Sequence, residues 1–306
     1  MVNAKIKISQ IESICATDIG RNISALAKVV AGDLFLAAES IVNQPAPKII
    51  IVTGFYIPQA NPPAPETDGI TGAVLMAKAF SKIGIPVDLI TDERCKTALK
   101  IAIDQKINKS NIRLFAIPNI SSKIAIEKLN QQWYQESQIP THIIYIERVG
   151  PGSDGDCHNM TGLKVNQWNA PLHLLMAENK SLVSIGIGDG GNEIGMAKIP
   201  FKIISDNIKN GSKIACVVPC DFLIVAGVSN WGATALLLAM VLLKDKWKDT
   251  LLRILTSKTE YEILYQLSEK KLLVDGVTKR FEPTVDGLAW AFHLKMIRQM
   301  IRIANP

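Results

Sequence analysis

Short apolar runs alternate with amphipathic stretches along most of this chain, and this alternation restricts the fold more than any other feature. Each run is apolar at successive positions, which is typical of a strand buried on both faces of a parallel sheet. We expect strands in 48–55, 87–92, 112–117, 142–147, 182–188, 213–218 and 221–228. Helices are expected over 70–84, 95–105 and 121–136. This order predicts a three-layer α/β fold with a largely parallel sheet.

Both ends of the chain are predicted to add helices to this sheet. Apolar residues recur at helical spacing from Ile23 to Ile41, which predicts one long helix before the first strand. Residues 290–303 predict the last helix. No repeat of fixed period and no linker composition divides the chain, so we expect residues 1–306 to form a single α/β domain. An arrangement in two lobes stays open.

Composition limits the partners of the protein. The 306 residues carry a formal net charge of +6, with scattered lysines and arginines and no interleaved aromatic residues, so no nucleic-acid partner is expected. No apolar run approaches the ~20 residues that cross a bilayer, and no signal-peptide pattern is seen. The five cysteines lack a Cys-x-x-Cys pair, which argues against structural zinc. We therefore expect a cytoplasmic protein without a membrane partner, and a homo-oligomer stays open.

Glycine-rich and acidic loops follow several of the predicted strands. These loops are 53–55, which continues to 66–69, and 147–162, 188–195 and 226–232. Ligands of open parallel sheets bind outside the carboxyl ends of the strands. A single Asp-Gly pair is equally typical of a simple turn. Several such loops on one edge of a sheet, however, predict a site for a small molecule.

The loop "GDGGNEIG" combines flexible backbone with paired carboxylates. Gly190 and Gly191, followed by Asn192, can turn successive N–H groups toward a bound anion. Asp189 and Glu193 are four residues apart and share a face if a helix begins there. Paired carboxylates bind a hard cation or divide acid and base roles. The loop lacks the pattern of a P-loop or of a dinucleotide fingerprint, so no nucleotide cofactor is expected.

Other polar residues in these loops have two interpretations each. Arg148 can clamp a substrate carboxylate with its planar fork. His158 lies in a polar, glycine-rich segment and is a candidate for proton transfer or ligand binding, with a structural role as the alternative. Asn159 can donate to an oxyanion or cap the following turn. Ser229 and Asn230 can contact a ligand or cap the helix that follows.

Several acidic residues of these loops also form a candidate metal site. Asp68, Asp189 and Asp286 would repel one another unless protons, basic side chains or a cation offset their charge. Oxygen ligands suit Mg²⁺ or Mn²⁺, which would polarise a carboxylate. The alternative is that Arg148 and backbone N–H groups do this without a metal.

Taken together, these strings resemble the D-glutamate cyclase family from about Thr53 to Gly287. The matching strings are "TGF", "ETDG", "TD" at 91–92, "ERVGP", "HNMTG", "GDGGNEIGM", "AGVSNWGA" and "DGVT". The resemblance implies a stand-alone, bacterial-type lyase that acts on an acidic amino acid. It would convert D-glutamate to 5-oxo-D-proline and water, with Asp189, Glu193 and His158 as candidate catalytic residues. Alternatives are another metal-assisted α/β enzyme acting on a carboxylated or phosphorylated metabolite, and a non-catalytic binding protein for such a metabolite.

Overall fold

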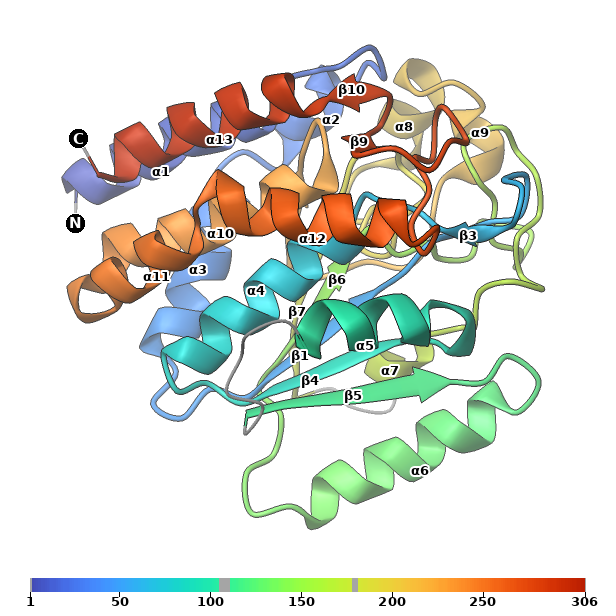
Figure 1. The fold of residues 1–306 in the computed structure, drawn as a ribbon, viewed down its shortest axis with the longest axis horizontal. Helices are drawn as coiled ribbons and strands as arrows, with labels where there is room; N and C mark the ends of the chain where they lie inside the picture. The colour runs from blue at the N-terminus through green and yellow to red at the C-terminus, as the bar shows by residue number, and fades with distance from the viewer. Residues whose placement is uncertain (1, 105–110, 178–180, 306) are drawn as a thin grey trace.

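Six parallel strands form the central sheet in a computed structural model that describes residues 2–104, 111–177 and 181–305 (Figure 1). The strand order is β5-β4-β1-β6-β7-β8, and every neighbouring pair is parallel. These strands are β1 (Ile49–Thr53), β4 (Val87–Asp92), β5 (Ile112–Ile117), β6 (His142–Ile146), β7 (Val183–Gly188) and β8 (Phe222–Val225). The predicted three-layer α/β class is confirmed.

Helices cover both faces of this sheet because its strands are apolar on both sides. Ile49 and Ile51 of β1 pack into a core shared with the first group of helices, whereas Ile50 and Val52 face the second group. The first group includes α1 (Val2–Cys15), α3 (Asp33–Asn43), α4 (Ile70–Lys82), α5 (Lys96–Asp104), α10 (Ser229–Leu243), α11 (Lys248–Ile254), α12 (Ser257–Glu269) and α13 (Trp290–Ala304). The second face is covered by α6 (Ser122–Gln135), α7 (Leu174–Ala177), α2 (Ser24–Val29), α8 (Phe201–Asn207) and α9 (Gly211–Ile214).

Helix α10 lies at the centre of the first group. It packs against α1, α3, α4 and α13, and every residue from Ser229 to Val241 is buried. A helix that is apolar all round is typical of such a position. Figure 1 shows α1 and α13 side by side, outside α10.

Short elements complete the fold around the loops. They are β2 (Tyr56–Ile57), β3 (Ala64–Pro65), β9 (Thr284–Val285), β10 (Leu288–Ala289) and the 3₁₀ helices η1 (Glu93–Cys95) and η3 (Asp245–Trp247). β2 pairs with β3, and β9 pairs with β10, both antiparallel. Both hairpins belong to segments that reach the edge of the sheet where β1, β6, β7 and β8 end.

Two expected elements are wrong. The single helix from Ile23 to Ile41 is divided into α2 and α3, because Gly32 adopts φ +99° and its N–H donates to the carboxylate of Glu12. Residues 213–218 are not a strand. Helix α9 ends at Ile214, and the backbone N–H of Cys216 donates to the carbonyl of Gly191 in a loop. The expected helix over 95–105 ends at Asp104, and Gln105 lies outside the described residues.

Helix α12 carries a buried carboxyl group that makes stability depend on pH. Burial raises the pKa of Glu260 from 4.5 to about 8, and Asp68 adds to the rise. Folding therefore favours the protonated form, so this contribution to stability is complete at low pH. It is lost as the pH rises from about 4.5 to about 8.

Replacing Glu260 with glutamine is expected to remove this loss. The free energy of unfolding of Glu260→Gln should exceed that of the unmodified protein by up to about 4 kcal/mol at pH 8.5, and the difference should vanish below about pH 4. Denaturant unfolding across this pH range measures both. Glu262→Gln, on the exposed side of the same helix, is the matched control. Identical pH slopes for Glu260→Gln and the unmodified protein would contradict the assignment.

Candidate active site

A cavity of about 680 Å³ opens where β1, β6 and β7 end. Its walls come from loops that are far apart in the sequence but adjacent on the edge of the sheet. The ionisable and amide residues that line it are Arg21, Asn22, Glu66, Glu147, Asn159, Asp189, Asn192, Lys209, Asn210, Lys279 and Asp286. A cavity of this size and polarity suits a small charged molecule.

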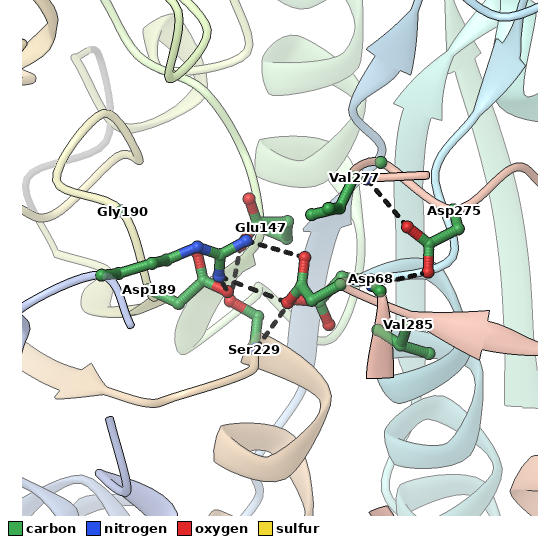
Figure 2. Close-up of polar contacts among 12 residues, drawn as sticks. Asp68, Glu147, Asp189, Gly190, Ser229, Asp275, Val277 and Val285 are labelled. Carbon is green, nitrogen blue, oxygen red and sulfur yellow. Dashed lines mark hydrogen bonds and ion pairs between the residues drawn. The ribbon is translucent and has the colours of Figure 1, made fainter. Parts of the chain in front are cut away.

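Buried carboxylates converge on the inner end of this cavity. One oxygen each of Asp68, Asp189 and Asp286 lie within 4.8 Å of one another, and the same is true of Glu147, Asp189 and Glu193. Figure 2 shows Asp68, Glu147 and Asp189 pointing toward one another, with Ser229 below them. Asp189 belongs to both groups and is therefore the centre of the cluster.

Burial and mutual repulsion make Glu147, Asp68 and Asp189 weak acids. Burial raises the pKa of Glu147 well above its ordinary value, and Glu193 and Glu66 add to the rise. Burial likewise raises the pKa of Asp68 to about 7, with a further contribution from Asp286. Burial also raises the pKa of Asp189 well above its ordinary value, and the charge of Arg21 opposes this rise without cancelling it. The site can therefore hold both protonated and ionised carboxyl groups at neutral pH.

Arg21 is a candidate functional residue that the loop strings did not indicate. Its guanidinium pairs with Asp189 and, through two hydrogen bonds, with Asp286. Burial opposes its charge, but these carboxylates together hold the pKa of Arg21 well above its ordinary value. The polar segment "DIGRN" at 18–22 was the only available signal, and nothing in it indicates a partner 168 residues away.

The N–H groups of the glycine-rich loop after β7 bind a carboxylate of the same loop, that of Glu193. The carboxylate of Glu193 accepts hydrogen bonds from the N–H groups of Asp189, Gly190 and Gly191 at 2.7–3.0 Å. No helix begins at Asp189, so the expected reason for its proximity to Glu193 is wrong. Gly190 and Gly191 therefore hold Glu193 rather than presenting these N–H groups to a ligand.

Arg148 lies in the core and does not line the cavity. Its side chain is fully buried, pairs with Asp92 and donates to the carbonyls of Gly54 and Ala170. Both terminal nitrogens of the guanidinium are therefore used in contacts within the core. The geometry does not fit the expected substrate clamp, because the arginine fork is already committed.

His158 likewise does not line the cavity. Its ring is fully buried, and Nε2 lies 3.4 Å from a carboxylate oxygen of Asp154 without forming a hydrogen bond. Only its backbone approaches the site, since its carbonyl accepts from the side chain of Asn192. The geometry therefore does not favour the catalytic role expected of His158.

Asn230 caps α4 rather than the helix that follows it, and Ser229 caps none of the described helices but contacts the acidic cluster. Asp68 accepts from the N–H groups of Ser229 and Asn230, while Asn230 accepts from those of Gly69 and Gly72. Asp68, just before α4, therefore caps α10, and Asn230, in the first turn of α10, caps α4. The hydroxyl of Ser229 donates to Glu147 at 2.6 Å.

Asn159 and Asn192 are the predicted substrate-binding amides that line the cavity. Asn159 caps its own turn, because its side-chain oxygen accepts from the N–H groups of Thr161 and Leu163. Asn192 donates to the loop at His158, and its side-chain oxygen has no hydrogen-bond partner. The structure therefore supports the capping interpretation for Asn159 and leaves the oxygen of Asn192 free for a further contact.

Comparison with known proteins identifies the family. A family model described as "D-glutamate cyclase-like, C-terminal" matches residues 11–301. The chain belongs to this D-glutamate cyclase-like family. A human relative named "D-glutamate cyclase, mitochondrial" is 31% identical over 249 residues, which are 79% of this chain and 40% of the human protein. The chain thus spans about 40% of the length of that relative.

Membership of the D-glutamate cyclase-like family confirms the resemblance drawn from the loop strings. The match also covers Arg21, which lies before the first of those strings. Within the described ranges, none of the helices is long and apolar enough to cross a bilayer.

Proposed function

We propose that this chain converts D-glutamate to 5-oxo-D-proline and water. The observation that carries the proposal is the contrast between two neighbouring carboxyl groups in one cavity. Burial raises the pKa of both groups, but Asp189 pairs with the guanidinium of Arg21, which opposes the rise, whereas Glu147 has the Ser229 hydroxyl as its partner and carboxylates around it. Such a contrast separates a base from an acid.

The reaction needs both of these groups. Asp189 takes a proton from the substrate ammonium, so that the nitrogen lone pair can form a bond to the γ-carbon. One γ-oxygen then takes a proton from Glu147 and one from Asp189, and it leaves as water when its bond to carbon breaks. The second proton of the nitrogen returns to Glu147. Glu193 is assigned a positioning role, because its oxygens are held by three backbone N–H groups.

The test is chromatography of oxoproline after incubation with D-glutamate and, separately, with L-glutamate. Oxoproline from D-glutamate in excess of that from L-glutamate supports the proposal. Tight binding of D-glutamate without turnover would instead make the chain a binding protein for an acidic metabolite. A cytoplasmic location and a homo-oligomer stay predictions that this assay does not address.

We also propose Asp68, Asp189 and Asp286 as the ligands of Mg²⁺ or Mn²⁺. Their chemistry fits, because all three offer carboxylate oxygens within 4.8 Å of one another. Arg21 pairs with two of them, so the guanidinium has to shift when a cation binds. A bound cation would supply positive charge to polarise the substrate carboxylate.

Exhaustive chelation is expected to lower turnover, and added Mn²⁺ or Mg²⁺ is expected to restore it. The physical reason is that the buried carboxylates repel one another when no cation is bound. Asp286→Asn should require a higher metal concentration for the same rate, because it removes one anionic ligand. Full activity in chelator with no response to either ion would contradict the metal site and leave the charge to Arg21.

A further inference from the structure

We propose that Arg21 binds the substrate carboxylate that reacts, and that Lys209 and Lys279 receive the other carboxylate. This assignment rests on the proposed function and adds which residues of the chain bind each end of the substrate. It follows from the contacts of Arg21, from its neighbours and from the charges that line the cavity.

The guanidinium of Arg21 has N–H donors that are not used by residues of the protein described by the structure. Of its five N–H donors, three are used in hydrogen bonds to Asp189 and Asp286. The other two have no partner among the described residues, and the side chain is 19% exposed and lines the cavity. A planar fork of this kind can take a carboxylate oxygen through its two remaining donors.

A carboxylate held there lies beside the acid and the base. Asp189 contacts Arg21 directly, and an oxygen of Glu147 lies within 4.8 Å of an oxygen of Asp189. Proton transfer requires approach to within hydrogen-bond distance. The group on Arg21 is therefore the group that loses an oxygen. The guanidinium would donate hydrogen bonds to this carboxylate and to the oxyanion formed by amine attack.

Arg21 is held in place by its own segment of chain. The side chain of Asp18 accepts hydrogen bonds from the N–H groups of Gly20, Arg21 and Asn22 at 2.8–3.2 Å. At the start of the same segment, the carbonyl of Cys15 accepts from the N–H of Gly227, in the loop before α10. The arginine thus projects from a braced turn, and such preorganisation is what electrostatic catalysis requires.

Two lysines also line the cavity that contains Arg21. Lys279 donates to the carbonyl of Gly276, and Lys209 forms no ion pair with any described residue. Positive charges at separate places in an otherwise acidic cavity match a ligand with two carboxylates. We therefore expect the unreactive carboxylate to lie toward these lysines.

Chemical rescue tests the role of Arg21. Arg21→Ala is expected to lower kcat for oxoproline formation by about 10²–10³-fold, and guanidinium salts below denaturing concentration should restore part of it with saturation. Arg21→Lys should recover less, since an ammonium lacks the fork. Lys209→Ala should mainly raise KM. The matched control is Arg280→Ala, an arginine whose side chain is 71% exposed and paired with Glu282, for which neither loss nor rescue is expected.

Binding of glutarate, a dicarboxylate without the amine, separates this inference from the proposed reaction. Calorimetry should show glutarate binding that Arg21→Ala weakens by about tenfold or more, in line with the loss of a charge-assisted pair. Unchanged glutarate affinity, or a loss of kcat that guanidinium does not rescue, would overturn the assignment. If glutarate binds through Arg21 but D-glutamate yields no oxoproline, the proposed reaction fails and Arg21 keeps its role as a carboxylate ligand.

Discussion

Asp189→Asn is expected to lower the rate of oxoproline formation by about 10²–10⁴-fold, the range typical of losing a general base. An amide of the same shape cannot accept the ammonium proton, and it weakens the ion pair with Arg21. The backbone of the loop should stay in place, because the N–H of Asp189 donates to Glu193 irrespective of the side chain. Initial rates and thermal melting, measured on the same preparation, test both statements.

Asp206→Asn provides the matched control for this substitution. Asp206 lies on α8, is exposed and, among the residues that the structure describes, pairs with its neighbours Lys202 and Ser205. We expect its rate and melting temperature to equal those of the unmodified protein. Activity retained in Asp189→Asn would remove Asp189 from the chemistry. A rate loss that tracks a fall in melting temperature would make its role structural.

The sheet could be predicted because its signal is local. In β1, both Ile50 and Ile51 are buried, one on each face, so the run is apolar at successive positions. The break between α2 and α3 has a distant cause, since the carboxylate of Glu12 binds the N–H groups of Gly32 and Leu34. Periodicity alone cannot report a contact made across 20 residues.

The position of the site could be predicted, but not the direction of its side chains. Loops after parallel strands meet at one edge, and this brought Asp68 and Asp189 together as expected. Whether Arg148 faces the cavity or the core depends on Asp92, which is 56 residues earlier in the chain. Likewise, the sequence does not reveal that the carboxylate of Glu193 accepts the hydrogen bonds of the glycine-rich loop.

Two important residues were missed for related reasons. Arg21 precedes the first strand, so the rule about strand ends does not reach it. Glu147 stands directly after β6, where that rule does apply. Its proposed role as an acid depends on burial and on Glu193 and Glu66, which raise its pKa. Charge states of this kind depend on tertiary neighbours and cannot be deduced from residue type.

Arg148→Met is expected to lower the free energy of unfolding by about 3–5 kcal/mol, because it leaves the carboxylate of Asp92 buried and unpaired. The carbonyls of Gly54 and Ala170 lose a donor in the same step. The double variant Arg148→Met/Asp92→Asn should recover part of this loss, since a neutral amide can still accept from the N–H of Ala170. Denaturant unfolding of the two variants measures the difference.

Kinetics at a temperature where the variants are folded separate this structural role from substrate binding. If Arg148 acts only in the core, Arg148→Lys should leave KM for D-glutamate close to that of the unmodified protein while its stability falls. An ammonium cannot reproduce the fork that spans Asp92 and two carbonyls, so a fall in stability is expected even though the charge is kept. A raised KM at unchanged stability would show that Arg148 reaches the substrate, and Arg21 would then not be the only arginine that binds it.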